Sequence, residues 1–350
     1  MESVRWGILS ISGHYALRVH TPLSRLSEAK IVAIASRDAG KAKAAAARFG
    51  IGRSYGSYAE LIEDPEVEAI YMPLPNSLHA EWAITALEAG KHVLCEKPIA
   101  LDKAQAEGMA AKAKARGLLL MEAFMYRFHP QWLRARRIVA SGELGRIRAI
   151  QTWFSYDNSD PANIRNKPET GGGALYDIGC YAVSSARFLA AASPGRSPSL
   201  MDAGQKNARE EIVPSRCLYV ADRDPIFGTD VRGSGILDFG PEGPRVSFHV
   251  ATKAFPAQRV EVMGEAGSLA ISLPFNAYPD VPMVLEVSTS LGTRRIEEGP
   301  ADQYGLIFAA FSRAIREGKP EPTPIEDGVA NMAVLDALFR SEKSGAWEAV

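Results

Sequence analysis

Two opposite charges follow directly on an apolar run in "HVLCEKPIAL" (residues 92–101). The letters "VLC" predict a buried strand, whereas Glu96 and Lys97 are poorly suited to packing. Side chains at a strand end stand at the rim of the sheet, where open α/β sheets bind their ligands. Pro98 restricts Lys97 to extended conformations and so fixes its direction. The alternative interpretation is a surface loop with an incidental ion pair.

A second pair of groups suited to proton transfer, Asp177 and Tyr181, stands in "ALYDIGCYAV". Their spacing of four residues places both on one face of a predicted helix. Oxidation of an alcohol requires a base within hydrogen-bond reach of the hydroxyl. A tyrosine pKa of about 10 is high for that task, but a neighbouring ammonium such as that of Lys97 would stabilise the phenolate. The alternative for Tyr181 is core packing with a locally satisfied hydroxyl.

The turn "GILSISGHYA" follows the first predicted strand and is the candidate for binding a cofactor pyrophosphate. Dinucleotide folds use glycines here so that backbone N–H groups can approach the phosphates. Gly7 and Gly13 are present, but Ser10 and Ser12 stand where glycines are usual. A one-residue register change would make Gly13 the close-approach glycine, and the serine hydroxyls could donate to phosphate. An ordinary strand–turn–helix is the alternative.

The end of the second predicted strand, "AIASRDAGK", indicates which dinucleotide is bound. NAD-specific sites place Asp or Glu there to hold the ribose 2′-hydroxyl. This chain has Ser36 and Arg37, with Lys41 in the following turn. A hydroxyl and a guanidinium suit a 2′-phosphate, so we predict NADP(H) in preference to NAD(H). The alternative is a solvated Arg37 paired with Asp38.

Alternating strand and helix patterns must position these groups in the first part of the chain. Such alternation predicts βαβ units and a parallel sheet covered on both faces. Glycines end several of these helices, as is usual at a helix C-terminus. The predicted strands are 4–9, 30–36, 67–74, 91–98 and 118–124, and the predicted helices end near 26 or span 39–50, 58–64, 77–90 and 102–117.

After about residue 125 the pattern changes. A helix (130–142), a strand (146–156) and a Gly-rich turn with a helix (171–190) come first, and two amphipathic helices (303–318 and 325–345) come last. Between them, period-2 runs separated by Gly and Pro predict an antiparallel sheet of about six strands. These runs are 216–222, 232–239, 245–252, 258–264, 268–273 and 283–289.

Composition narrows the possible partners. A net charge of −1 gives no electrostatic case for nucleic acid or an anionic membrane, and no stretch has the apolar length of a bilayer span. The N-terminus lacks the basic region of a signal peptide, and three dispersed cysteines fit a reducing cytoplasm. No metal is predicted, because neither set has metal-ligand spacing: Cys95, Cys180, Cys217 and His14, His20, His92, His249.

Over nearly its whole length the chain resembles the Gfo/Idh/MocA oxidoreductases, named for glucose–fructose oxidoreductase and inositol dehydrogenase. "PLPNSLHAEWAITALEAGKHVLCEKPIAL" looks like the signature block of that family. "EAFMYRFHP", "NIRNKPETGGGALYDIGCYAV" and "RVEVMGEAGSLAISLPFNA" resemble the branch with NADP-dependent aldose dehydrogenases and dimeric dihydrodiol dehydrogenase. The expected fold is α/β: a Rossmann parallel sheet (1–124) and an α+β domain with a large, mainly antiparallel open sheet (125–350). The last helices could pack back on the first domain.

The resemblance implies roles for the candidate residues. Lys97 reaches the active site beside the nicotinamide, and a tyrosine stands in this branch where Tyr181 does. We therefore expect Tyr181 as acid/base, Lys97 as its electrostatic partner and hydroxyl donor, and Asp177 as anchor of the substrate or of the lysine. The roles of Lys97 and Tyr181 could be exchanged. Glu96 could orient the backbone or the cofactor, or serve only as a countercharge.

Further contacts rest on the same resemblance. The nicotinamide side of the cofactor is expected near Leu74, Asn76 and His79 in "PLPNSLH", although His79 could equally make a structural bond at a helix start. Arg165 resembles an arginine that reaches the cofactor from the second domain. Glu122 and His129 could line the substrate cleft, with a turn role for His129 at least as well supported. The segment 191–211 is longer than the usual connection and could touch a neighbouring subunit or the cleft edge.

The leading functional hypothesis is an NADP-dependent oxidoreductase of a sugar or cyclic polyol, with oxidation of an aldose at C1 as one form of it. A keto-sugar reductase and a dihydrodiol dehydrogenase remain alternatives within the class. A dinucleotide-sensing regulator is disfavoured by the intact Lys97, Asp177 and Tyr181, and an NAD-retaining glycosidase by Ser36 and Arg37. The resemblance also implies a homodimer or homotetramer formed through the second domain.

Overall fold

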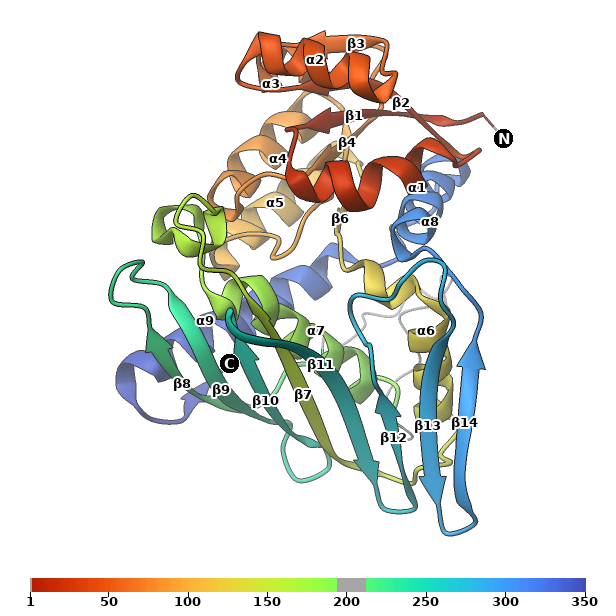
Figure 1. Cartoon of the computed structure of the whole chain (residues 1–350), viewed down its shortest axis with the longest axis vertical. Helices are drawn as coiled ribbons and strands as arrows, with labels where there is room; N and C mark the ends of the chain where they lie inside the picture. The colour runs from red at the N-terminus through yellow and green to blue at the C-terminus, as the bar shows by residue number, and fades with distance from the viewer. Residues whose placement is uncertain (1, 194–211) are drawn as a thin grey trace. The chain divides into compact units, whose positions relative to one another are not determined.

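The chain divides into two compact units. Figure 1 labels their helices and strands. The computed structural model describes residues 2–193 and 212–350, so most of the segment 191–211 lies outside the described residues. Unit 1 comprises Met1–Met125 and Asp302–Val329, and unit 2 comprises Tyr126–Ala301 and Ala330–Val350. Unit 1 therefore takes in a late stretch of chain that contains a whole helix.

Unit 1 is built on six parallel strands in the order β3-β2-β1-β4-β5-β6, which confirms the predicted Rossmann sheet. In this order the winding reverses between β1 and β4, and ligands bind beyond the carboxyl ends of the strands at that point. The strands are β1 (Val4–Leu9), β2 (Ala29–Ala35), β3 (Arg53–Tyr55), β4 (Ala69–Met72), β5 (His92–Cys95) and β6 (Leu120–Glu122). The helices among them are η1 (Tyr15–Val19), α1 (His20–Ser24), α2 (Ala39–Phe49), α3 (Tyr58–Glu63), η2 (Asn76–Leu78), α4 (His79–Glu88) and α5 (Lys103–Arg116).

Capping residues set the two ends of helices α2 and α5 in unit 1. The carboxylates of Asp38 and Asp102 accept hydrogen bonds from the third backbone N–H after each, and so begin α2 and α5. Gly50 and Gly117 end the same two helices with positive φ values of 66° and 64°. The stops predicted at these two glycines are thereby confirmed.

The late helix of unit 1, α8 (Gln303–Glu317), packs on the start of the chain. The indole Nε1 of Trp6, a fully buried residue on β1, donates to Ser312 Oγ at 3.1 Å. The Trp6 ring also packs edge-on against Phe308, with 4.9 Å between centroids, and lies 5.8 Å from Phe311. Aromatic pairs in this geometry add to the gain from apolar burial. The core of unit 1 therefore depends on residues from both ends of the sequence.

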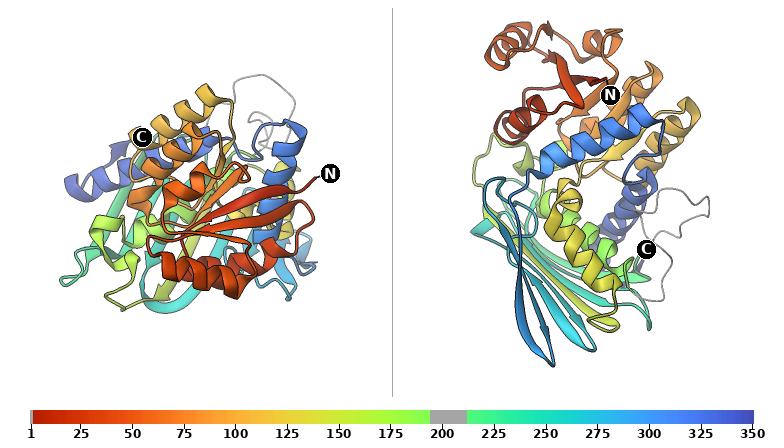
Figure 2. Two further views of the ribbon diagram at one scale, coloured as in Figure 1. Left: turned by 90° about the horizontal axis from the view of Figure 1, so that it is seen from above. Right: turned by 90° about the vertical axis from the view of Figure 1, so that its right-hand side faces the viewer.

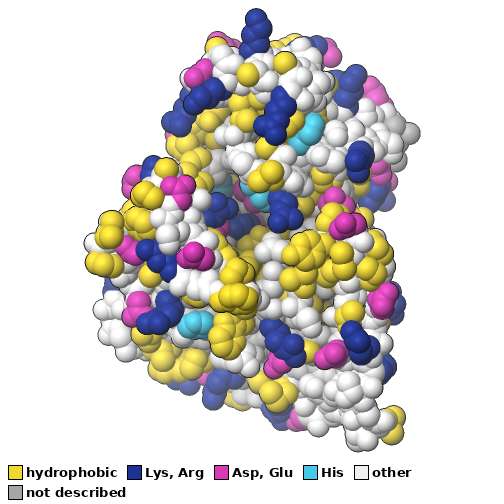
Figure 3. Space-filling model, in the orientation of Figure 1, with side chains coloured by type: hydrophobic (Ala, Val, Ile, Leu, Met, Phe, Trp, Pro, Cys, Tyr) yellow, Lys and Arg dark blue, Asp and Glu magenta, His cyan; other side chains and the backbone are white. Residues whose placement is uncertain are grey.

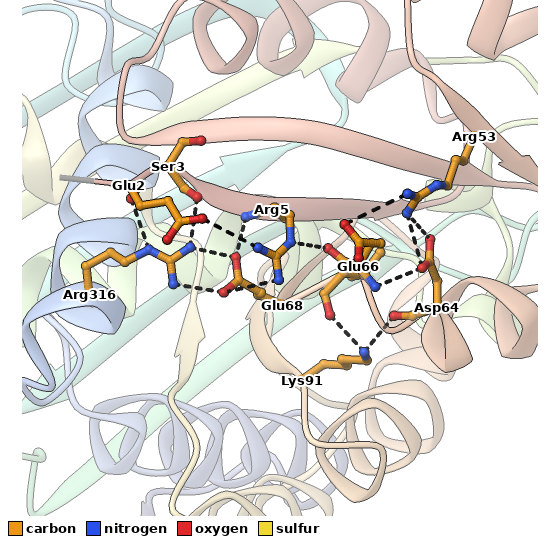
Figure 4. A network of polar contacts seen from close by, with 10 residues as sticks. Glu2, Ser3, Arg5, Arg53, Asp64, Glu66, Glu68, Lys91 and Arg316 are labelled. Carbon is orange, nitrogen blue, oxygen red and sulfur yellow. Dashed lines mark hydrogen bonds and ion pairs between the residues drawn. The ribbon is translucent and has the colours of Figure 1, made fainter.

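A polar network beside this core joins α8 to the first strand (Figure 4). The guanidinium of Arg316 donates to both carboxylate oxygens of Glu68, at 2.8 and 2.6 Å, and to the carbonyl of Ser3. Glu68 also accepts from the backbone N–H of Arg5. The hydrogen bonds from Arg316 lower the pKa of Glu68, which keeps the carboxylate charged.

Unit 2 contains a nine-stranded sheet in the order β14-β13-β12-β11-β7-β10-β9-β8-β15. β7 and β10 pair in parallel, and every other neighbouring pair is antiparallel. The strands are β7 (Ile147–Asp157), β8 (Arg216–Arg223), β9 (Asp230–Asp238), β10 (Arg245–Ala251), β11 (Lys253–Gly264), β12 (Gly267–Ile271), β13 (Met283–Thr289), β14 (Gly292–Glu298) and β15 (Glu348–Ala349). The mainly antiparallel open sheet is confirmed, with more strands than the six expected.

Helices cover one face of this sheet. The right-hand view of Figure 2 shows α6 and α7 against it, and these helices contact β13 and β7. Along β7, Thr152 and Phe154 point to this covered face and are buried, whereas Trp153 points away and is 49% exposed. The helical segments are η3 (Met125–Phe128), α6 (Pro130–Ala140), η4 (Ile164–Asn166), η5 (Pro168–Thr170), η6 (Leu175–Gly179), α7 (Cys180–Ala190) and α9 (Ile325–Ser344).

The surface carries charges of both signs. Figure 3 shows Lys and Arg interspersed with Asp and Glu over the face drawn there, which agrees with the net charge of −1. Among residues 2–193 and 212–350, no helix combines the length and apolar character that crossing a bilayer requires.

We expect Arg316→Gln to lower the free energy of unfolding by about 2 kcal/mol, because it removes the nearest charged donor of the partly buried Glu68 carboxylate and leaves it only the more distant guanidinium of Arg5, at 3.6 Å. Urea unfolding followed by tryptophan fluorescence measures this. The matched control is Arg313→Gln, one turn earlier on α8, whose exposed pair with Glu28 should matter by less than about 1 kcal/mol. Equal stability of the two variants would show that the network of Figure 4 does not hold α8 in place.

Candidate active site

The turn after β1 has a strained serine where dinucleotide folds usually place glycine. Among the described residues, Ser10 is the one non-glycine residue with positive φ, at 103°. Backbone in this region costs a residue with a side chain about 1–3 kcal/mol, and such residues concentrate at functional sites. The strain at Ser10 shows that the loop keeps the conformation of a glycine turn although glycine is absent.

Ser12, Gly13 and Gly7 have different structural roles in and around this turn. Ser12 begins the helix, because its Oγ accepts from the N–H of Tyr15 at 3.0 Å and its carbonyl from Ala16. Gly13 is exposed, and a Cβ there would have no atom within 4 Å. This open space at a helix N-terminus fits a cofactor phosphate. Gly7 serves packing instead, since a Cβ there would lie 2.6 Å from Leu61 Cδ2.

The groups expected to bind the ribose phosphate lie just beyond β2. Ser36 Oγ accepts from the N–H of Asp38 at 3.3 Å, and Asp38 is itself occupied as the N-cap of α2. Arg37 and Lys41 are exposed and have no ion-pair partner among residues 2–193 and 212–350. The alternative pairing of Arg37 with Asp38 is therefore not formed. Two unpaired cations beside a hydroxyl fit a 2′-phosphate.

His79 ties the end of β4 to the loop after β5. Its ring is fully buried, with Nδ1 2.9 Å from the carbonyl of Pro98 and Nε2 3.0 Å from that of Leu74. Burial lowers the pKa of His79, so the ring is neutral and its single N–H donates to one carbonyl at a time. We therefore assign His79 the structural bond that the sequence left open, with Asn76 at the start of η2 nearer the strand end.

Glu96 brings three segments together beside Lys97. Its Oε1 accepts from Tyr71 Oη at 2.6 Å and lies 3.5 Å from Nε2 of His14, close enough for an ion pair when the imidazole is protonated. Burial alone would raise the pKa of Glu96. His14 and Tyr71 outweigh it, with a further contribution from Lys97, and the pKa is lowered to about 2. A fixed negative charge thus stands next to Lys97. The peptide bond between Lys97 and Pro98 is cis.

Two residues expected at a substrate cleft have structural partners. Glu122 is 4% exposed, and its Oε1 accepts from the backbone N–H of Ile99 at 2.9 Å. His129 is fully buried and caps α6, because its Nδ1 accepts from the N–H of Gln131. The turn role that the sequence allowed for His129 therefore describes its position. Glu122 supports the loop that follows Lys97.

In unit 2 the structure brings Asp177, Arg165 and Tyr181 together. Asp177 lies in η6, a π-helical turn that leads directly into α7, where Tyr181 stands in the first turn. The Nε of Arg165 lies 2.9 Å from Asp177 Oδ1, and the hydroxyl of Tyr156 on β7 donates to Oδ2. Asp177 raises the pKa of Arg165, and burial followed by Asp177 raises the pKa of Tyr156. Tyr156 is therefore a donor to Asp177 and not a base.

Glycines make the turn before η6 possible. Gly173 has a φ of 117°, and a Cβ there would lie 2.0 Å from Asp230 Oδ1. A Cβ on Gly172 would lie 2.5 Å from the carbonyl oxygen of Arg165. Asp230 in turn accepts from the N–H of Leu175 at 2.7 Å and so caps η6. The "GGG" run thus lets the Arg165 loop and Asp230 both approach the start of this helix.

Tyr181 rests on an aromatic cluster. Its ring lies 5.1 Å from that of Phe275, 5.6 Å from Phe154 and 5.9 Å from Tyr126, measured between centroids, and the residue is 6% exposed. The packing expected from the alternative interpretation is therefore present. It fixes the direction of the side chain, which a positioned acid/base also requires. An electrostatic interaction with Arg165 distinguishes Tyr181 from a simple core residue, since the phenol contributes, after Asp177, to raising the pKa of Arg165.

Sequence reasoning missed Tyr156, Asp230 and the pairing of His14 with Glu96. Tyr156 stands on the buried face of a strand with a period-2 pattern. Its hydroxyl was the single sequence feature that could have suggested a functional role. Asp230 and His14 carry no local signal, because their partners are distant in sequence. Among the described residues, no three His, Cys, Asp or Glu side chains form a group that could hold a metal ion.

Comparison with known proteins matches both units. The model described as "Oxidoreductase family, NAD-binding Rossmann fold" matches residues 4–124, and the "GFO/IDH/MocA C-terminal domain" matches residues 132–270. An uncharacterised oxidoreductase of Rhizobium meliloti is 43% identical over 357 residues, with 100% of both chains covered. The NADP-dependent D-xylose 1-dehydrogenase 2 of Haloferax volcanii is 34% identical over 97% of this chain and 98% of its own.

A solved structure extends the comparison to the whole fold. The 3-ketoreductase KijD10 of Actinomadura kijaniata, in complex with NADP and TDP-benzene, superposes with a TM-score of 0.84 at 29% identity. The match covers 97% of this chain and 98% of that one.

We expect Ser10→Gly to raise the free energy of unfolding by about 1 kcal/mol, because relief of the positive φ exceeds the entropy that glycine adds to the unfolded chain. Ser12→Ala should act in the opposite direction by about 1 kcal/mol, since it removes the hydroxyl that caps the helix. Thermal and urea unfolding of both variants measure this. A loss of stability in Ser10→Gly would mean that the Ser10 side chain contributes more than its backbone costs.

Proposed function

The chain belongs to the Gfo/Idh/MocA oxidoreductase family, as its sequence predicted, and on that premise we propose that it is an NADP-dependent dehydrogenase of a sugar or cyclic polyol. Oxidation of an aldose at C1 to the lactone is the form of the reaction that we favour. The observation that carries the proposal is the set formed by Tyr181, Asp177 and Arg165 at the start of α7. In this set the phenol of Tyr181 has a fixed direction, and the nearby carboxylate of Asp177 is neutralised by Arg165.

Unit 1 would bind the cofactor and unit 2 the substrate. Preference for NADP(H) is supported by the exposed Arg37 and Lys41, which have no ion-pair partner in the described part of the chain. The open space at Gly13 would admit the pyrophosphate at the helix N-terminus, with donors from the hydroxyls of Ser10 and Ser12. Asn76 and Glu96 would face the nicotinamide side. Arg165 is left out of this set, since its guanidinium is directed to Asp177.

The proposed reaction removes a hydride from carbon and a proton from oxygen. When bound, the nicotinamide would supply the hydride acceptor. Tyr181, as phenolate, takes the hydroxyl proton. The family resemblance implies that Lys97 is its electrostatic partner, since a nearby ammonium favours the phenolate. Reversal of these steps reduces a ketone, with Tyr181 as the proton donor.

That reversal is the second candidate function. It is favoured by the similarity to KijD10, a 3-ketoreductase crystallised with NADP and TDP-benzene. A keto-sugar reductase would use the same groups and differ in the substrate that it binds. We also propose a cytoplasmic homo-oligomer assembled through the exposed face of the nine-stranded sheet, which carries Trp153 and Met263 at 49% and 55% exposure.

The first test is formation of NADPH by the purified protein with NADP+ and a panel of D-xylose, D-glucose, other aldoses, inositols and a dihydrodiol. Steady turnover with one class is expected, and Tyr181→Phe should lower kcat about 100-fold or more by removing the proton acceptor. Tyr278→Phe is the matched control, because Tyr278 is an exposed tyrosine of the same unit. A folded Tyr181→Phe variant that keeps most of the turnover would refute the acid/base role. Binding of NADPH without turnover would favour reductase substrates or a dinucleotide sensor.

The second test concerns the cofactor. Arg37→Ala should weaken NADP+ binding about 10- to 100-fold and leave NAD+ binding nearly unchanged, because the guanidinium meets only the 2′-phosphate. Titration of intrinsic fluorescence with each dinucleotide measures this. Lys43→Ala, which removes one exposed charge from α2, the helix that follows Arg37, controls for the general field of that helix. Equal binding of NADP+ by Arg37→Ala and the unmodified protein would exclude the assignment.

A further inference from the structure

Asp177 poses an electrostatic problem for Tyr181. The two residues stand four apart at the junction of η6 and α7, so their side chains lie on the same face. A carboxylate near a phenol favours the neutral phenol, since a second negative charge would have to form beside the first. If Tyr181 is to act as a base, the charge of Asp177 must be balanced.

The structure balances that charge with two donors. Arg165 Nε lies 2.9 Å from Oδ1, and the Tyr156 hydroxyl donates to Oδ2, so each oxygen of Asp177 has its own partner. Asp177 is 7% exposed, and the low dielectric around it strengthens the pair with Arg165. Arg165 also interacts electrostatically with the phenol of Tyr181. One guanidinium thus acts on both members of the proposed site.

The loop that carries Arg165 is built to present it. The N–H of Arg165 donates to Asn163 Oδ1 at 3.0 Å, and its carbonyl accepts from Gly173 at 2.9 Å. Asn166 is 3% exposed, and its side-chain amide donates to the carbonyls of Asn158 and Asp160. A loop fixed at these points holds its arginine in one direction, as positioning of a partner charge requires.

We propose that Arg165 is a charge-balancing, positioning residue: it neutralises Asp177 and so allows Tyr181 to ionise as the acid/base. The inference rests on the proposed function of Tyr181 and deepens it. It replaces the expectation that Arg165 contacts the cofactor. The geometry assigns Asp177 the task of holding Arg165 against the phenol, with Tyr156 as the second support.

Another ionisable group, Tyr126, lies beside Tyr181. Tyr126, from η3, packs against the ring, while Phe154 and Phe275 add only apolar contacts. Tyr126 Oη lies 2.7 Å from Ser184 Oγ, and Arg127 also donates to Ser184, one turn further along α7. Arg127 thus donates to Ser184, whereas Arg165 pairs with Asp177, and that pair is the charge arrangement that the test alters.

The test follows ionisation of one tyrosine directly. 3-Fluorotyrosine is placed at position 181 in the full-length protein, and its pKa is read from the ¹⁹F shift against pH. Arg165→Gln should raise this pKa by about one unit or more, because Asp177 is then unbalanced. Asp177→Asn should lower it, and the double variant should return close to the unmodified protein. Arg165→Lys should restore part of the shift, and Arg148→Gln, at an exposed side chain near the start of β7, should cause none.

Two further readouts separate the possible failures. Arg165→Gln should leave NADP+ binding within about twofold and shift the pH profile of kcat in the same direction as the ¹⁹F titration. An unchanged ¹⁹F titration in Arg165→Gln would overturn the proposal, and a tenfold loss of NADP+ binding with that result would make Arg165 a cofactor contact. The fluorotyrosine titration needs no turnover. If no sugar is oxidised but the titrations of the five variants behave as stated, the charge balance holds and the proposed reaction fails.

Discussion

The carboxylate of Glu96 is the contact on which the carboxyl edge of the parallel sheet depends. It accepts from Tyr71 on β4, lies beside His14 after β1, and precedes Lys97 at the end of β5. A largely desolvated charge persists only where partners replace the water that it has lost, and the partly buried Glu96 keeps a low pKa because it has such partners. The strand ends at the switch point are therefore joined by one charge. Lys97 takes its place from this arrangement, and His79 and Glu122 support the loop that follows.

The sequence predicted those parts of the fold that are encoded locally. Alternation of strand and helix, the glycines that end α2 and α5, and the apolar face of α8 are visible in short windows and agree with the structure. β14 was missed because "GTRRIEE" is polar on both faces and pairs only at a sheet edge. The parallel pairing of β7 with β10 was missed because the two strands are far apart in the sequence. The chain between them carries no local pattern that indicates which strands pair.

The site shows the same division. Lys97, Asp177 and Tyr181 are proposed from their own types and spacing, with the roles that the resemblance implies. The partners that adjust them come from elsewhere in the chain: Tyr156 lies on another strand and Arg165 in a loop fixed by asparagines. Sequence spacing cannot give such contacts, because they are created by tertiary packing. For His79 the sequence offered two roles, and only the two carbonyls around its ring decide between them.

The place of α8 in unit 1 has a consequence for the order of folding on the ribosome. The strands of the parallel sheet emerge first, but the helix that covers Trp6 emerges only after every strand of the second sheet except β15. Until then the nascent sheet must keep an aromatic face exposed to water, where it is open to wrong contacts. The two units are therefore coupled in biogenesis, because the earlier unit can complete its core only when the chain is nearly finished. A fragment that ends after β6 would lack this cover and would be a poor substitute for the cofactor-binding unit.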